Sequence, residues 1–316
     1  MMRRQIITAA LGLAALPAVA FPVQPVTVVV PYPPGGPTDA MARALADLLR
    51  GRLGQPVVVE NRPGGGGQIA GTAVLRRPPD GHSLLVADTT TLAINPHIYR
   101  NFAYDPATGI TPIAPLLRMP HALFVPAASP FRSFADLRAA ARSQPLSFAS
   151  QGYGTVGHLL GEMLRQGTGG LLNHIPYQGS APAMTALLGR QVDLLFDGVG
   201  PGLQHVRGGG LRALAVAGAE RVTVLPDTPT AAEGGHPELS LAMWFGVVAP
   251  AGLPAGVLQQ LHDGIAWSTE QPQFGDRFLP MGFEPMAMSS DDFRAFIAAE
   301  TKRFAVLTKE NNITVQ

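Results

Sequence analysis

Three glycine-rich loops hold the residue types in this chain that are best suited to chemistry. They are residues 32–37, 63–67 and 150–154, and each follows a short apolar run and precedes an amphipathic stretch. Free N–H groups at the start of a helix, together with the helix dipole, favour an anion. None of the three runs contains Arg or Lys. They therefore predict that a small anion such as a carboxylate is held by dipoles and hydrogen bonds rather than by ion pairs.

The second loop also fits a different chemistry. Gly65–Ala70 matches the pattern G-x-G-x-x-A, and Asp88 ends the next predicted strand, 23 residues beyond Gly65. A dinucleotide-binding unit places its ribose-binding acid at such a position. The motif lies in the second strand–helix unit rather than the first, and its run of four glycines is longer than the usual turn. An exported NAD-dependent oxidoreductase remains an alternative on this pattern.

Signals for hydrolysis or metal binding are weaker. The chain has no G-x-S-x-G elbow and no H-E-x-x-H motif. Ser150 and His158 lie eight residues apart, and His158 and Glu162 have the i, i+4 spacing of two metal ligands. A single histidine at a helix start is more typical of a hydrogen-bonding group. Asp197 follows an apolar strand, where it can point toward a ligand or accept an Asx-turn hydrogen bond. We predict no catalytic residue, no metal and no cofactor.

The composition indicates a folded protein with many turns. The chain has 316 residues, 46% of them apolar and only 14% charged, together with 36 Gly and 30 Pro. The complete absence of Cys excludes disulfides, Cys-ligated zinc, iron–sulfur clusters and thiol nucleophiles. Without Arg3 and Arg4 the chain has 21 basic and 22 acidic side chains, a net charge of −1. That balance argues against a nucleic-acid partner.

The first twenty residues have the features of a signal peptide. Arg3 and Arg4 form the positive region, Ile6–Leu16 is apolar, and Ala18–Ala20 fits a cleavage site, so the mature chain starts near Phe21. The apolar run is shorter than the roughly 20 residues that a membrane span needs. No cysteine is present for a lipid anchor. We expect export to the periplasm as a chain that is not lipid-anchored.

Apolar runs alternate with amphipathic stretches through the rest of the chain. This alternation predicts a parallel sheet with helices on both faces. The expected strands are residues 26–30, 57–59, 84–87, 146–149, 173–175, 194–197, 213–217 and 244–248. The expected helices are 41–49, 68–76, 133–143, 156–166, 183–188, 256–268 and 291–309. Trp244 and Phe245 are expected in the core.

The pattern restarts after Pro126, which indicates two α/β units. Because the C-terminal helices need a sheet to cover, the second unit is expected as an insertion in the first. The predicted division is a signal peptide at 1–20, lobe 1 at 21–124 plus 228–316, and an inserted lobe 2 at 125–227. Proline-rich stretches at 126–130 and 226–229 are the expected crossings. Two crossings make a hinge, and a hinge between two lobes makes a cleft.

Ordered motifs along the chain carry a resemblance to a known family. The chain resembles the Bug family, the extracytoplasmic substrate-binding receptors of tripartite tricarboxylate transporters. The matching segments are Val30–Asp39 with Arg43, Val59–Gly64, Pro79–Gly81, Ile94–Pro96, Ser150–Thr155 with His158, Pro176–Pro182, Asp193, Asp197, Pro226–Thr230 and Trp244–Gly246. Departures such as Tyr32 and Pro33–Pro34 in the first loop bear on the choice of ligand rather than on the fold.

This resemblance implies a two-lobed α/β periplasmic-binding-protein fold, type II-like, that closes on a small carboxylate. One loop from each lobe would hold the carboxylate through backbone N–H groups and water. The residues that it implies are Tyr32, Pro34, Gly35, Gly36, Thr38 and Asp39 in the first loop, Ser150, Gln151, Gly152, Gly154, Thr155 and His158 in the second, and Thr89, Thr90, Tyr177, Ser180 and Asp197 around them. It further implies a monomeric receptor that delivers its ligand to the transporter's membrane subunits. The alternatives are a receptor without a cognate permease and an exported NAD-dependent oxidoreductase or hydrolase.

Overall fold

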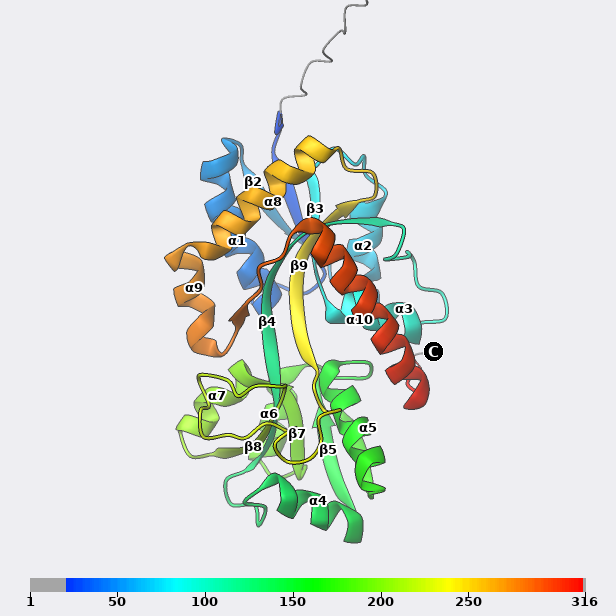
Figure 1. Ribbon diagram of the computed structural model, residues 1–316, viewed down its shortest axis with the longest axis vertical. Helices are drawn as coiled ribbons and strands as arrows, with labels where there is room; N and C mark the ends of the chain where they lie inside the picture. Colours follow the sequence, from blue (N-terminus) through cyan, green and yellow to red (C-terminus); the bar gives the residue numbers. More distant parts are fainter. Residues whose placement is uncertain (1–20, 315–316) are drawn as a thin grey trace, which may run out of the picture.

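The chain folds into two lobes stacked along the long axis of the molecule, as Figure 1 shows. The structure is a computed structural model and describes residues 21–314; the predicted signal peptide lies outside these residues. Within 21–314, no helix has both the length and the apolar character needed to cross a membrane.

We name the upper body of Figure 1 the terminal lobe and the lower body the central lobe. The terminal lobe contains β1 (Val26–Val30), α1 (Pro37–Leu53), β2 (Val57–Asn61), η1 (Gly65–Gly67), α2 (Gln68–Leu75), β3 (Ser83–Asp88), η2 (Thr90–Ile94), α3 (Asn95–Ile98), β9 (Ala242–Pro250), α8 (Ala255–Glu270), α9 (Pro272–Phe278), η3 (Leu279–Met281), β10 (Glu284–Pro285) and α10 (Ser290–Glu310). The central lobe contains α4 (Phe134–Ser143), β5 (Leu146–Ser150), α5 (Val156–Thr168), β6 (Leu172–Pro176), α6 (Ser180–Leu188), β7 (Leu194–Gly198), α7 (Val199–Arg207) and β8 (Leu211–Ala217). One long strand, β4 (Ile110–Pro126), belongs to both lobes.

The sheet is mixed, which corrects the expected parallel sheet. Its main strand order is β2-β1-β3-β9-β4-β7-β5-β6, and β8 and β10 also pair with β4. Strands β1, β2 and β3 are parallel to one another, as are β5, β6 and β7. Strands β9 and β4 are antiparallel to each other and to their neighbours β3 and β7. The strand–helix alternation describes each lobe but not these two central strands.

Strand β4 passes between the lobes without a loop. It pairs with β9 from Ile110 to Pro120 and with β7 and β8 from His121 onward. The change of partner therefore comes before the expected crossing at 126–130. On the return path, Val216 N still donates to Pro229 O at 2.8 Å. Residues 226–229 thus still lie against the central lobe. The lobe boundaries at 125 and 227 stay a prediction.

One apolar core is shared by both lobes on the side where Figure 1 shows α3, α5 and α10. It joins Ile98 of α3, Leu159 of α5 and Phe293 of α10. Trp244 and Phe245 are each 1% exposed, so their predicted core positions are confirmed. A second cluster packs α1 and α8 on the terminal sheet, and a third packs α6 and α7 on the central sheet.

Candidate functional site

The predicted site residues gather where strands β1, β3, β5, β6 and β7 end. Ligands of open α/β sheets bind beyond the carboxyl ends of parallel strands. The first loop leads from β1 to α1, and Thr89 and Thr90 follow β3. In the central lobe the second loop leads from β5 to α5, Tyr177 and Ser180 lie between β6 and α6, and Asp197 lies near the end of β7.

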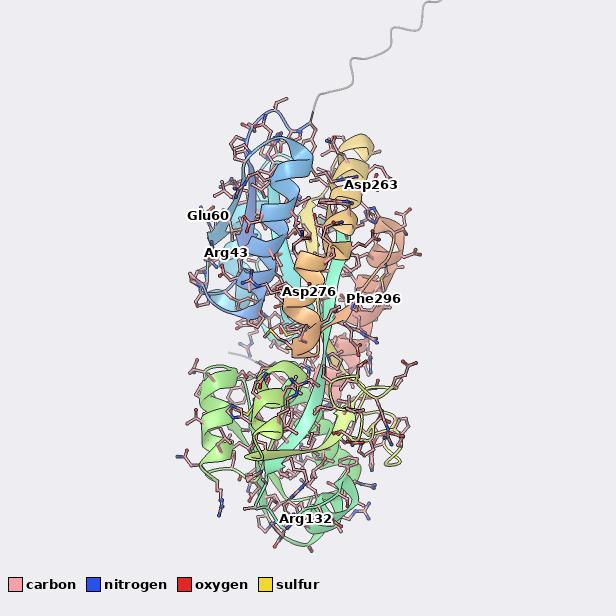
Figure 2. The ribbon with its side chains drawn as sticks, turned by 90° about the vertical axis from the view of Figure 1, so that its left-hand side faces the viewer. Arg43, Glu60, Arg132, Asp263, Asp276 and Phe296 are labelled. Atoms are coloured by element: carbon pink, nitrogen blue, oxygen red, sulfur yellow. The ribbon has the colours of Figure 1, made fainter. Side chains whose placement is uncertain are left out.

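Asp39 holds the first loop in shape. Its carboxylate accepts hydrogen bonds from Gly35 N at 3.0 Å, Arg43 Nε at 3.0 Å and Asn61 Nδ2 at 2.9 Å. Asn61 Nδ2 also donates to Tyr32 O at 3.0 Å. Burial raises the pKa of Asp39, but these hydrogen bonds outweigh it and lower the pKa to about 2. Figure 2 shows Arg43 at the outer side of the terminal lobe. Asp39 therefore positions the loop with a carboxylate that is already engaged.

The start of α1 is left uncapped by this arrangement. Gly36 is the N-cap residue and Pro37 the first helical residue, and no side chain caps the helix. Because Pro37 has no N–H, Thr38 and Asp39 supply the first amides of α1. Such amides form the positive end of the helix dipole. Pro34 and Gly35 are exposed beside them.

The residues that follow β3 brace the first loop from inside. Tyr32 Oη donates to Asp88 Oδ2 at 2.6 Å, and Asp88 Oδ1 accepts from Thr91 N at 2.9 Å. Burial raises the pKa of both Tyr32 and Asp88. Thr90, the next residue but one after Asp88, is half-buried. Thr89 is fully buried, and its Oγ1 accepts from Trp244 N at 2.8 Å. Thr89 therefore fastens β3 to β9.

The glycine run of residues 64–67 serves the fold of the terminal lobe. All four glycines have positive φ. A side chain on Gly66 would meet Asn95 and Tyr99, and one on Gly67 would meet Thr91. Asp88, the acid of the dinucleotide pattern, has 0% exposed surface. These glycines thus allow the backbone to pack closely against other residues of the terminal lobe rather than against a ligand. The carboxylate of Asp88 is already hydrogen-bonded to Tyr32 and Thr91.

The second loop is tied to itself and to α5. Thr155 is the N-cap of α5, and its Oγ1 accepts from His158 N at 3.3 Å and donates to Gly152 O at 2.9 Å. Gly154 N donates to His158 Nδ1 at 3.1 Å. His158 is 4% exposed. It therefore supports the loop from behind.

His174 completes this support, and the sequence analysis missed it. Its ring stacks on His158 at 3.9 Å between centroids, and its Nε2 lies 2.6 Å from Ser150 Oγ. Burial lowers the pKa of His158 to about 3 and that of His174 to about 4, so both rings are neutral near pH 7. The signal that would have found His174 is the parallel register of β5 and β6, which pairs it with Phe148.

The Ser150–His174 pair lacks the third member of a hydrolytic triad. His174 Nδ1 is buried without a hydrogen-bond partner, so no acid orients the ring. Its lowered pKa also makes it a poor base near pH 7. His158 Nε2 lies 3.9 Å from Glu162 Oε1, and Glu162 pairs with Arg165 at 2.7 Å. Among residues 21–314, no three His, Cys, Asp or Glu side chains gather as a metal site.

A buried carboxylate lies at the end of β7. Asp197 is 2% exposed and accepts hydrogen bonds from Ser180 Oγ and from Gly198 N, the latter at 2.7 Å. Beside it, Gln151 Nε2 donates to Phe196 O at 2.8 Å. Burial raises the pKa of Asp197 to about 6. Asp197 therefore ties the end of β7 to the start of α6, while Gln151 ties the second loop to β7.

The two lobes touch beside these loops. A side chain added to Gly154 would collide with Ile98 Cδ1 and come within 3.9 Å of Ile94 in the terminal lobe. A side chain added to Gly200 of α7 would lie 2.8 Å from Met281 O of η3. Tyr177 N donates to Ser150 O at 3.1 Å, and the ring is half-buried. The structure thus brings the second loop against the terminal lobe.

Comparison with known proteins gives consistent results. A family model described as "Tripartite tricarboxylate transporter family receptor" matches residues 41–313. Protein BugT of Bordetella pertussis is 36% identical over 309 residues, which cover 96% of this chain and 95% of that protein. A Rhodopseudomonas palustris protein solved with adipate has a TM-score of 0.83 and 34% identity, covering 93% of this chain and 99% of that one. The R. palustris protein MatC, solved with malate, has a TM-score of 0.79 and 30% identity, covering 91% and 99%.

Proposed function

Because the chain belongs to the receptor family of tripartite tricarboxylate transporters, it is a solute-binding receptor and not an enzyme, and we propose how it holds its solute. The solute is a small carboxylate, in line with the adipate and malate held by two relatives. It lies between the first loop of the terminal lobe and the second loop of the central lobe.

The uncapped start of α1 carries this proposal. The amides of Thr38 and Asp39 lack a side-chain acceptor, and Asp39 holds the loop before them through Gly35. A ligand carboxylate is the acceptor that such a helix start favours. No Arg or Lys lies between residues 32 and 39. The charge of the ligand is therefore met by amide dipoles.

The second loop supplies the contacts to the ligand from the central lobe. Gly152, Gly154 and Thr155 follow β5, and the neutral His158 and His174 hold their backbone. A ligand drives closure only if it binds the closed form better than the open form. Contact with both loops at once provides that difference. Gln151 of this loop donates to Phe196 O of β7, next to the Asp197–Ser180 pair.

The cellular setting follows from the family and from the leader. Receptors of this family are periplasmic. We propose that residues 1–20 are removed on export, that the mature protein is a monomer, and that it hands its ligand to the membrane subunits of a tripartite tricarboxylate transporter.

Thermal unfolding with a ligand panel tests this function. The panel contains adipate, malate, citrate, benzoate, the uncharged adipamide and NAD. A ligand at 100 times its Kd stabilises by about 2.7 kcal/mol, a readable change in melting temperature. We expect one or a few carboxylates to stabilise the protein and adipamide to have no effect. Stabilisation by NAD alone would overturn the proposal. The proposal would also be overturned if no compound in the panel changed the melting temperature and native mass spectrometry found no acid bound to the protein as purified.

A further inference from the structure

A cavity lies where β4 and β9 meet the C-terminal helix α10. Its volume is about 520 Å³, within the roughly 300–1,000 Å³ of small-molecule sites. Its walls come from β4 and β9, from the segment between β8 and β9, and from residues 284–288 with α10. Figure 1 shows α10 running beside β9, and the segment between β8 and β9 in the central lobe below. None of the proposed carboxylate-binding residues lines it.

Aromatic rings and methionines form the apolar part of this cavity. Trp244 and Phe296 both line it and meet edge to face, with ring centroids 5.4 Å apart and an angle of 72°. Met286 and Met288 line it as well, and both are half-buried. Figure 2 shows Phe296 on α10, above the segment between β8 and β9. Methionine side chains adapt their shape to what they contact, so this wall suits a small apolar body.

Glu300 places a carboxylate in the same cavity. Its side chain is 15% exposed, and its Oε2 accepts from Trp244 Nε1 at 3.2 Å. Arg303 is its nearest cation, with Nη1 3.6 Å from Glu300 Oε1, while Arg303 Nη2 donates to Ser240 O at 2.5 Å. Arg303 is thus shared between two acceptors. A buried carboxylate that meets its cation only at this distance retains capacity for another donor.

The charges around the cavity leave one carboxylate in excess. Arg118 pairs with Glu284 at 2.6 Å, and Arg303 pairs with Glu300. Glu220 also lines the cavity, is exposed, and has no ion pair among residues 21–314. The lining therefore carries a net charge of −1. This sign is opposite to the one that a carboxylate ligand would need.

We propose that this cavity is a second ligand site and that it takes a small organic cation with an aromatic or apolar body. The ammonium group donates to Glu300, and the half-buried ring of Phe296 attracts the same charge. The body of the ligand lies against Met286 and Met288. The site is separate from the carboxylate site and binds the opposite charge.

Calorimetric titration with phenethylammonium tests this site, with phenethyl alcohol as the uncharged ligand of the same shape. We expect phenethylammonium to bind and the alcohol to bind at least about tenfold more weakly, because a hydrogen bond to a charged group contributes about 1.5–3 kcal/mol. Glu300→Gln keeps an acceptor for Trp244 and should weaken phenethylammonium binding by the same factor. Glu310→Gln, also on α10 but outside the cavity, is the matched control and should bind as the unaltered protein does.

A filling variant keeps the test decisive if Glu300→Gln fails to fold. Ala287→Trp adds bulk at an exposed residue of the lining and leaves every charge in place. It should abolish phenethylammonium binding and leave carboxylate stabilisation unchanged. The proposal is overturned if phenethylammonium does not bind, if the alcohol binds equally well, or if Ala287→Trp and Glu300→Gln both bind like the unaltered protein. Each of these results can occur while carboxylate binding persists.

Discussion

Replacing Gly36 by aspartate or asparagine tests the anion-binding start of α1 with little risk to the fold. Gly36 is the N-cap, with φ −80° and ψ 172°, and a Cβ there would have no atom within 4 Å. Asp and Asn are preferred N-cap residues and stabilise a helix relative to Gly by a few tenths of a kcal/mol. Their side-chain oxygen accepts from the amides of Thr38 and Asp39. Those are the amides that we assign to the ligand.

The two substitutions distinguish the effect of occupying the helix-start amides from the effect of adding a negative charge beside them. Asn fills the position with a neutral acceptor, and the loss of one charge-assisted hydrogen bond, about 1.5–3 kcal/mol, predicts binding at least about tenfold weaker. Asp does the same and adds a negative charge near the ligand carboxylate. At a separation of about 5 Å and an effective dielectric constant of about 20, the repulsion is roughly 3 kcal/mol, or about 150-fold. The difference between Asp and Asn should shrink as salt is added.

Isothermal titration with the carboxylate found in the panel measures these effects. Gly256→Asp is the matched control because Gly256 lies in the first turn of α8 and also has no atom within 4 Å of a Cβ. It should leave the affinity unchanged. If Gly36→Asp folds with an unchanged melting temperature and binds within twofold of the unaltered protein, the α1 start does not hold the ligand.

Three further predictions concern the groups that support the site. Because the pKa of Asp197 is raised to about 6, the contribution of this one group to stability should fall as pH rises from about 4 to 6. Asp197→Asn should therefore stabilise the protein by up to about 3 kcal/mol at pH 8, seen as a higher melting temperature, and should have no such effect at pH 4. If the variant instead lost more stability at pH 8 than at pH 4, the prediction would be contradicted. His158 and His174, with pKa values lowered to about 3 and 4, should bind no proton above pH 5 in NMR titrations of the folded protein, and the contribution of these two rings to stability should fall from pH 6.5 toward 4; a midpoint near 6.5 would refute their burial. Gly154→Ala should lower the free energy of unfolding by about 1–2 kcal/mol because of its φ of +72°, and by a further amount because its methyl group collides with Ile98. The collision should disappear in the Ile98→Ala background; equal losses in both backgrounds, measured by urea unfolding, would exclude the contact.

Local patterning predicted most elements of the two lobes but missed the longest strand. The β-branched run at Val26–Val30 and the helical spacing of α1 both appear where expected. Strand β4 contains Pro112, Pro115 and Pro120, which normally argue against a central strand. Its register with β9 shifts after Pro112 and after Pro115. The strand thus accommodates Pro112 and Pro115 where its pairing with β9 is irregular, and local periodicity does not predict such irregularities.

The site could be predicted as far as its loops but not as far as their supports. Glycine loops after apolar runs marked the first and second loops directly. The partners that hold them are distant in sequence. Asn61 reaches Asp39 across 22 residues, and His174 reaches Ser150 across 24. Such contacts depend on which strands pair and in which register, and local periodicity gives neither.

The passage of β4 from one lobe to the other has a consequence for measuring ligand capture. Because this strand joins the lobes without a loop, closure of the lobes on a ligand would require it to bend or twist. A rigid-body rotation of this kind changes distances most at the far ends of the molecule. Arg132 and Asp263 are exposed and lie near opposite ends of the view in Figure 2. Since the chain has no cysteine, cysteines introduced at these two positions would be the sole labelling sites for a pair of dyes. Energy transfer between them would turn the protein into an optical sensor for whichever acid it carries.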